Sequence, residues 1–156
     1  MKEVKGNIFN FITEGVYLVQ QTNTEGVMGA GIAAQIRQIF PNVYNKYRAL
    51  CASNINIMGA CQIVDDTYKG YNVKICNCFA QDLSTYYNGH LTDYNALYNS
   101  LYYLSNVCEK DATILIPKNI GCGIGGGDWN VVLEIITKVL GNFNIIIVDF
   151  NGDSLI

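Results

Sequence analysis

Two short, unbroken apolar runs with an amphipathic segment between them limit the possible folds of this chain more than any other feature. The runs are ATILIP at 112–117 and NIIIVDF at 144–150, and the segment between them places Trp129, Ile136 and Leu140 on one side of a helix. A strand that is apolar without alternation is covered on both faces, which is typical of a parallel sheet. The pattern therefore predicts a β-α-β unit.

The N-terminal half shows the same alternation of strand and helix signals. Val4–Phe9 and Val16–Thr22 are rich in β-branched and aromatic residues and are predicted to be strands. A helix is expected from about Ala30, where apolar residues recur at helical spacing, and Pro41 should end it. A second helical stretch is predicted over Val43–Ala52.

The middle of the chain predicts a hairpin followed by a helix. CQIVDD at 61–66 and YNVKICNCFA at 71–80 read as strands joined through the turn-like TYKG. Thr92 is a plausible N-cap for a helix whose apolar stripe runs from Tyr94 to Cys108. Together these elements predict an α/β fold: a three-layer α/β/α sandwich with a central mixed, mostly parallel sheet.

Length and composition favour one domain spanning residues 1–156. The chain has 50% hydrophobic residues, enough for a sizeable core, and no linker or repeat divides it. A net charge of -3 with ten scattered Lys and Arg argues against nucleic acid as a partner. No leader pattern opens the sequence and no apolar run reaches membrane-spanning length, so we expect a soluble, cytoplasmic protein without a membrane partner.

The six cysteines do not form a metal-binding pattern. No C-x-x-C occurs, Cys76 and Cys78 would share one face of a strand, and a single histidine cannot complete a zinc set. Reduced cysteines acting as small buried apolar groups are the preferred interpretation. We therefore expect no metal.

Two glycine-rich loops each follow a predicted strand and precede a predicted helix. They are NTEGVMGAG at 23–31 and PKNIGCGIGGGDW at 117–129. Glycine lets backbone amides approach a ligand, and a following helix adds its positive N-terminal end, so a pyrophosphate would fit. The alternative is that both loops only make tight turns, with Asp128 as an ordinary N-cap.

Neither loop is a P-loop, and one matches a dinucleotide-binding pattern only by letter. GCGIGG at 121–126 fits G-x-G-x-x-G, but it comes late in the chain and no ribose-binding acid follows it in a further strand. The pattern therefore argues against a dinucleotide oxidoreductase.

Three stretches in this order resemble the macrodomains, which bind ADP-ribose. They are QTNTEGVMGAGIAAQI with FP after it, NCFAQ followed by TDYNAL, and IPKNIGCGIGGGDW, and the resemblance spans residues 4 to about 148. It is strongest to the branch described as ADP-ribose 1''-phosphate phosphatases. The resemblance implies a macrodomain sandwich that hydrolyses ADP-ribose 1''-phosphate to ADP-ribose and phosphate, with no metal or organic cofactor.

Two other functions stay open. One is a non-catalytic reader of free or protein-linked ADP-ribose, for which an ADP-ribosylated protein would be a partner. The other is a hydrolase that removes an acyl group or a protein side chain from the distal ribose.

The resemblance also assigns roles to individual residues. Asn7, in GNI, stands where the family usually has an Asp against the adenine amino group, and its amide oxygen can still accept a hydrogen bond without charge assistance. Asn23 matches the asparagine at the distal ribose, where it would orient the ribose or the attacking water. The expected ligand-binding residues are Asn7, Ile8, Asn23, Gly29, Ala30, Gly31, Ile32, Gly121, Cys122, Gly123, Ile124 and Gly125.

Two departures from the related glycohydrolases limit the chemistry. Those relatives carry a Lys and an Asp where this chain has Gln81 and Gly125, so covalent catalysis through that Lys is excluded here. His90 is a candidate general acid or base, with an exposed loop histidine as the alternative. Asp128 is a weaker candidate base, because N-capping accounts for it.

The aromatic residues are interpreted in two groups. Tyr94, Tyr98 and Tyr102 fall on the helical stripe and are predicted to be core residues. Tyr86 and Tyr87 lie in a loop after NCFAQ, from which a ring could cover the adenine or the distal ribose. Phe150, at the end of the last strand, is a candidate lid.

Overall fold

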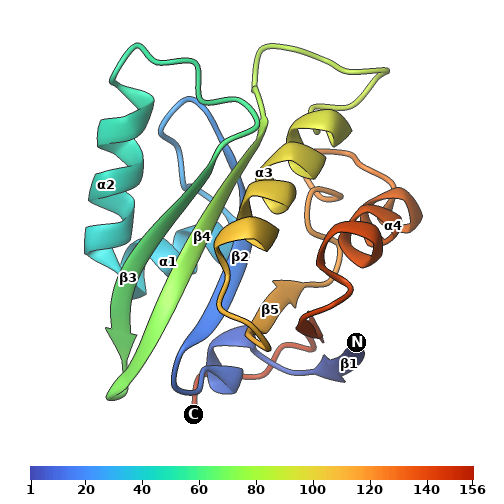
Figure 1. Ribbon diagram of the computed structural model, residues 1–156. Helices are drawn as coiled ribbons and strands as arrows, with labels where there is room; N and C mark the ends of the chain where they lie inside the picture. Colours follow the sequence, from blue (N-terminus) through green and yellow to red (C-terminus); the bar gives the residue numbers. More distant parts are fainter.

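The computed structural model describes residues 1–156, and Figure 1 shows the arrangement of its elements. In chain order they are β1 (Lys2–Lys5), the 3-10 helix η1 (Ile8–Phe11), β2 (Val16–Asn23), α1 (Gly31–Ile39), α2 (Pro41–Cys51), β3 (Cys61–Tyr68), β4 (Tyr71–Gln81), α3 (Tyr94–Val107), β5 (Thr113–Pro117), α4 (Trp129–Leu140) and β6 (Asn144–Asp149).

The six strands form one sheet in the order β1-β6-β5-β2-β4-β3. Only β3 and β4 pair antiparallel, and every other neighbouring pair is parallel. In Figure 1, α3 and α4 cover the near face of the sheet and α1 lies behind it. The predicted three-layer α/β/α sandwich with a mixed, mostly parallel sheet is confirmed.

Side chains of the central strands alternate between two hydrophobic cores. On β2, Val16 and Leu18 pack in the cluster that contains residues of α1 and α2, whereas Tyr17 and Val19 pack in the cluster that contains residues of α3 and α4. The period-2 geometry of a strand produces this division. The central strands are thus covered on both faces, and the loops at their carboxyl-terminal ends extend from this packed core.

The predicted hairpin is confirmed, with longer strands than expected. Lys69 and Gly70 both have positive φ, at 50° and 84°, which is typical of a two-residue type I′ turn. The turn sets the register so that Cys61 lies opposite Cys78. All six cysteines are free thiols, and Cys76 and Cys78 are fully buried on the same face of β4.

The prediction of a strand over Val4–Phe9 is wrong after Lys5. Gly6 adopts a φ of 148°, and Asn7 then caps η1 by accepting a hydrogen bond from Phe9 N at 3.2 Å. The apolar residues of this stretch therefore pack from a short helix instead of a strand. This turn places Asn7 at the end of β1.

Two helix starts also differ from the prediction. Asp93, not Thr92, is the N-cap of α3, because its carboxylate accepts from Asn95 N and Ala96 N. The Thr92 hydroxyl instead donates to the carbonyl oxygen of Gly121 at 2.7 Å. The second helix begins at Pro41, two residues before the expected start, since proline suits the first helical position.

One of the three tyrosines predicted to be core residues is on the surface. Tyr102 is 55% exposed and stacks on Tyr98, with ring centroids 6.3 Å apart. The buried stripe of α3 runs instead through Leu97, Leu101 and Leu104, so these two tyrosines lie at its edge.

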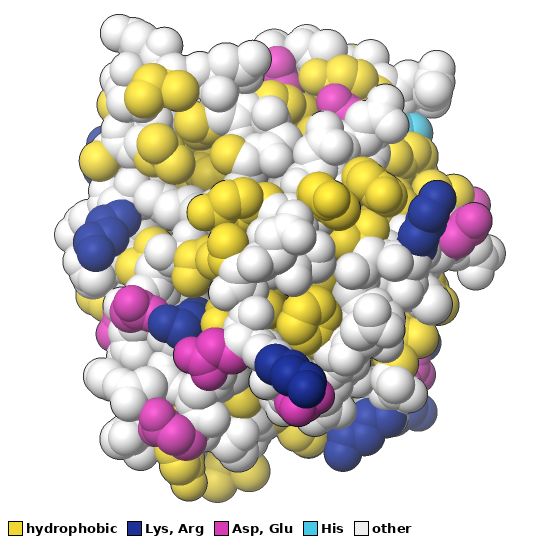
Figure 2. Space-filling model, in the orientation of Figure 1, with side chains coloured by type: hydrophobic (Ala, Val, Ile, Leu, Met, Phe, Trp, Pro, Cys, Tyr) yellow, Lys and Arg dark blue, Asp and Glu magenta, His cyan; other side chains and the backbone are white.

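Charges of both signs are interspersed on the face seen in Figure 2, without a broad basic patch. None of the helices combines the length and apolar character that a membrane crossing requires.

Candidate ligand-binding site

A cavity of about 590 Å³ lies at the carboxyl-terminal edge of the sheet. Its lining comes from the segments that follow five strands, β1, β2, β4, β5 and β6, and from the start of α1. This is where ligands bind in open α/β sheets, because the loops there converge on one crevice. The volume suits a ligand of nucleotide size.

The first loop is built around the side chain of Asn23. Its Oδ1 accepts hydrogen bonds from the Tyr47 hydroxyl at 2.6 Å, from Glu25 N at 3.1 Å and from Val27 N at 3.3 Å, and its Nδ2 donates to Val27 O at 2.8 Å. Tyr47 is fully buried, and burial raises the pKa of its hydroxyl, so it remains a donor. Asn23 therefore fixes the path of the loop that borders the cavity.

The start of α1 presents unpaired backbone amides to the cavity. Ala30 is the N-cap and has no side-chain oxygen to accept from the first turn. Gly31 has a φ of 59°, which a residue with a Cβ rarely adopts, although no neighbouring atom would contact such a Cβ. The glycine is thus required by backbone conformation, and the free N–H groups form a ready anion site.

The second loop has glycines for a different reason, close packing. A Cβ on Gly121 would lie 2.7 Å from Gln21 Oε1, and a Cβ on Gly125 would overlap the Thr92 hydroxyl. The Gly121 carbonyl oxygen accepts from both Thr92 Oγ1 at 2.7 Å and Gly127 N at 2.9 Å. The second loop therefore packs directly against the side chains of Gln21 and Thr92.

An amide network forms the wall beside this second loop. Gln21 Nε2 donates to Thr92 Oγ1 at 2.8 Å and to Gln81 Oε1 at 3.2 Å. Gln21 Oε1 is buried without a partner. The sequence does not predict the roles of Gln21 and Thr92 in this wall. The Thr92 hydroxyl contacts both Gln21 and Gly121, which are distant in the chain, so no local pattern indicates these contacts.

Lys118 is the only charged side chain that lines the cavity. It follows β5 directly and pairs with Glu3 at 3.3 Å and with Asp149 at 3.8 Å. No carboxylate and no imidazole lines the cavity. Apart from Lys118, the lining therefore consists of uncharged side chains and backbone groups.

Two carboxyl groups lie near the cavity in sequence, Glu25 two residues after Asn23 and Asp82 directly after Gln81. Hydrogen bonds from Ser84 lower the pKa of Asp82 to about 2. Partial burial and the neighbouring Asp82 raise the pKa of Glu25, which also accepts from Leu83 N at 3.2 Å. These groups join the loops after β2 and β4 and do not face the cavity.

The sequence model of the Macro domain family matches residues 19–136, which is most of the chain. The chain belongs to the Macro domain family. The match confirms the macrodomain resemblance of the three sequence stretches.

Two curated proteins and one solved structure place this macrodomain among its relatives. An uncharacterised 17.5 kDa protein of Enterobacteria phage T4 is 25% identical over 154 residues, 96% of each chain. The ADP-ribose 1''-phosphate phosphatase of Candida albicans is 32% identical over 135 residues, 81% of this chain and 85% of the relative. The structure of Thermosipho africanus DarTG in complex with ADP-ribose matches with a TM-score of 0.73 and 18% identity, covering 97% of this chain and 41% of that one.

The macrodomain brings together eleven of the twelve residues expected to bind the ligand. The lining includes Asn7, Ile8, Asn23, Gly29, Ala30, Gly31, Ile32, Gly121, Gly123, Ile124 and Gly125. Cys122 does not line the cavity, because its thiol turns back to the Ile120 carbonyl oxygen at 3.3 Å and packs on the core beneath α3 and α4. That the eleven lining residues contact a ligand remains a prediction.

His90 does not line the cavity, and its role as a general acid or base stays a prediction. Its Nδ1 lies 2.6 Å from the Thr92 carbonyl oxygen, and its ring packs on Tyr94 with centroids 4.7 Å apart. The loop before α3 runs beside the second glycine loop, where Leu91 N and Thr92 N both donate to the Gly125 carbonyl oxygen. Asp128 likewise serves as the N-cap of α4, accepting from Asn130 N at 2.8 Å.

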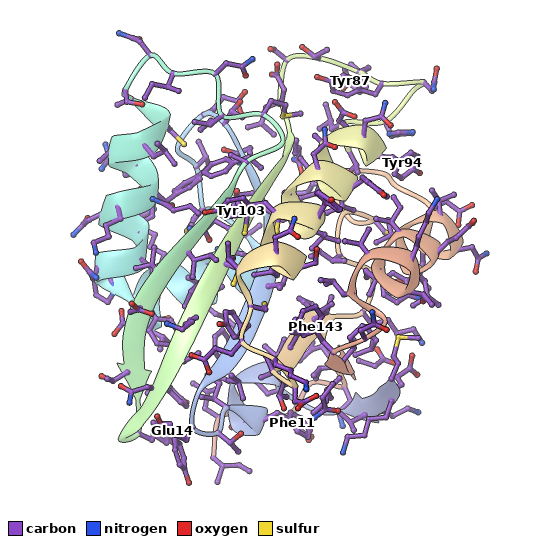
Figure 3. All side chains as sticks on the ribbon, viewed as in Figure 1. Phe11, Glu14, Tyr87, Tyr94, Tyr103 and Phe143 are labelled. Atoms are coloured by element: carbon purple, nitrogen blue, oxygen red, sulfur yellow. The ribbon has the colours of Figure 1, made fainter.

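Of the three aromatic residues considered as covers for the ligand, only Phe150 lines the cavity. Tyr86 is 70% exposed, and neither it nor Tyr87 lines the cavity. Figure 3 shows Tyr87 on the loop leading into α3, whose first turn carries Tyr94. Phe150 does line the cavity and is 62% exposed, so its role as a lid stays a prediction.

Proposed function

We propose that this macrodomain binds ADP-ribose 1''-phosphate in the cavity and hydrolyses it to ADP-ribose and phosphate. The observation that carries the proposal is the pair of glycine loops on one cavity, where the uncapped start of α1 offers free amides to a diphosphate. The relative from Candida albicans, named for this activity, supports it. So does the structure of DarTG in complex with ADP-ribose, since 41% of that chain shares this fold.

The cavity suits catalysis by positioning more than by a strong nucleophile. By the sequence resemblance, Gln81 and Gly125 stand where glycohydrolases have a Lys and an Asp, so this proposal does not use a covalent step. The Gln81 side chain accepts a hydrogen bond from Gln21. The phosphate would be held by amides of the second loop, with Asn23 ordering the adjacent loop against the distal ribose. Preorganised donors of this kind stabilise developing charge without a proton donor of their own.

A second function, binding without turnover, is favoured by one observation. No histidine, aspartate or glutamate lines the cavity to act as a general acid or base. A reader would hold free ADP-ribose or an ADP-ribosylated protein in the same place.

Phosphorus NMR of ADP-ribose 1''-phosphate with the purified protein in EDTA separates the two functions. A phosphatase removes the monoester signal and produces inorganic phosphate, while the pyrophosphate signals stay intact. A monoester that persists while its signals broaden indicates binding alone. Unchanged, sharp signals would contradict both functions.

The pH dependence of turnover is expected to follow the substrate, not the protein. The monoester changes charge near a pKa of about 6, so the rate should level off above neutrality and stay within about twofold up to roughly pH 9.

His90→Asn, whose amide nitrogen can replace Nδ1 at the Thr92 carbonyl, should retain the wild-type rate within about twofold. Phosphate-release assays across pH measure the profiles of the wild type and of the variant. A bell-shaped wild-type profile that is lost in His90→Asn would show that His90 acts as a general acid or base.

A further inference from the structure

A chain of hydrogen bonds sets the orientation of the Gln81 side-chain amide. The Thr92 hydroxyl donates its single hydrogen to the Gly121 carbonyl oxygen at 2.7 Å, and a carbonyl oxygen can only accept. The end of Gln21 that lies 2.8 Å from Thr92 Oγ1 must therefore be the donor Nε2, and the end of Gln81 that lies 3.2 Å from this nitrogen must be the acceptor Oε1. The Gln81 nitrogen is thereby turned away from the network.

This nitrogen of Gln81 is an accessible donor on a residue that lines the cavity. Nε2 donates to no atom of the protein, and it does not belong to the buried polar atoms that lack a partner. The backbone of Gln81 is held as well, because its carbonyl oxygen accepts from Thr24 N at 3.1 Å and residue 81 pairs with Thr92 in an antiparallel bridge. Both hydrogens of Nε2 are therefore free to bind a ligand.

The same network reaches the second glycine loop. Thr92 Oγ1 donates to the Gly121 carbonyl oxygen, and Thr92 N donates to the Gly125 carbonyl oxygen at 3.0 Å. Gln81 is thus tied through Gln21 and Thr92 to the loop whose backbone amides would hold the phosphate. An ionised phosphate oxygen accepts hydrogen bonds and cannot donate them, so it matches Nε2 and would be repelled by Oε1.

We propose that Gln81 binds the phosphate of ADP-ribose 1''-phosphate through Nε2, and that Gln21 is the positioning residue that holds this donor in place. An unrestrained amide can present either its nitrogen or its oxygen to the cavity by rotation about the last side-chain bond. The hydrogen bond from Gln21 selects the nitrogen before the substrate arrives, and such preorganisation makes a donor effective on developing charge. This inference rests on the proposed function and assigns a side-chain partner to its phosphate.

Gln81→Met tests the donor, because it keeps the length of the side chain and removes both ends of the amide. We expect kcat/KM for phosphate release from ADP-ribose 1''-phosphate to fall about tenfold to a hundredfold, since a hydrogen bond to a charged group is lost. The dissociation constant of ADP-ribose, which lacks this phosphate, should change less than about threefold. A phosphate-release assay and calorimetric titration measure the two quantities. Gln38→Met, the same change at an exposed position of α1 outside the cavity lining, is the matched control and should alter neither.

The outcomes for Gln81 and for the proposed function are distinguishable. Equal losses for ADP-ribose and for the monoester, or no loss for either, would overturn the role of Gln81 while turnover by the wild type stands. If the wild type binds the monoester without releasing phosphate, the proposed hydrolysis fails, and the dissociation constants of the two ligands test Gln81 by the same comparison. If the wild type binds neither ligand, both fail.

A double-mutant cycle tests the positioning role of Gln21. Gln21→Met should lower kcat/KM for the monoester at least about threefold, since the Gln81 amide can then turn its oxygen toward the phosphate. In the Gln81→Met protein the same substitution should cause no further loss, because Gln21 acts only through that amide. Losses that multiply in the double variant would contradict the positioning role.

Discussion

Gly125→Ala is expected to abolish ligand binding and to lower the free energy of unfolding by about 1–3 kcal/mol. The added Cβ would overlap the Thr92 hydroxyl and lie 2.6 Å from the Gly121 carbonyl oxygen, which is backbone and cannot rotate away. The second loop must therefore move, and Thr92 must give up its contact with Gly121 or with Gln21. Denaturant unfolding and calorimetric titration with ADP-ribose measure the two effects.

Gly123→Ala is the matched control in the same loop. No atom lies within 4 Å of a Cβ built on Gly123, so its stability should change by less than about 0.5 kcal/mol. Equal stability of the two variants, with binding retained by Gly125→Ala, would show that the second loop does not pack on Thr92 as described.

Asn23→Ala is expected to reduce turnover of ADP-ribose 1''-phosphate by at least about 100-fold and to weaken binding about tenfold or more. The substitution removes four hydrogen bonds that hold residues 23–27, so the loop beside the distal ribose loses its shape. Steady-state phosphate release and calorimetric titration separate the two losses.

Tyr47→Phe provides the graded comparison. It removes one hydroxyl from this network and keeps the ring stacked on Phe79, whose centroid is 5.8 Å away. Its losses should be smaller than those of Asn23→Ala and of the same kind. If Asn23→Ala binds ADP-ribose as tightly as the wild type while turnover disappears, Asn23 acts on the reacting group and the loop does not depend on it.

The fold could be predicted wherever local pattern and tertiary packing agree. The unbroken runs at β5 and β6 are buried on both faces, and the helix between them buries Val132, Ile136 and Leu140 as its spacing indicates. The error at Val4–Phe9 has a local cause, because IFNF is apolar enough for a strand while the glycine and asparagine before it start a short helix.

The site was less predictable because its key contacts join distant parts of the chain. Glycines mark both loops, so the lining of the cavity follows from the motifs. The place of Thr92 before a helix predicts an N-cap, but its hydroxyl donates to the carbonyl oxygen of Gly121, 29 residues away. Likewise, the bond from Asn7 to the Asp153 carbonyl spans 146 positions, and no short-range pattern reports it.

The two strands at the ends of the sheet carry charges that bear on behaviour in concentrated solution. β1 reads KEVK, and β3 carries the adjacent Asp65 and Asp66, the first of which pairs with Lys74 at 2.6 Å. An unpaired strand edge invites a strand from another molecule, and charged side chains oppose that addition. Mutations that neutralise either edge would therefore favour self-association, even though both edges lie outside the lining of the cavity.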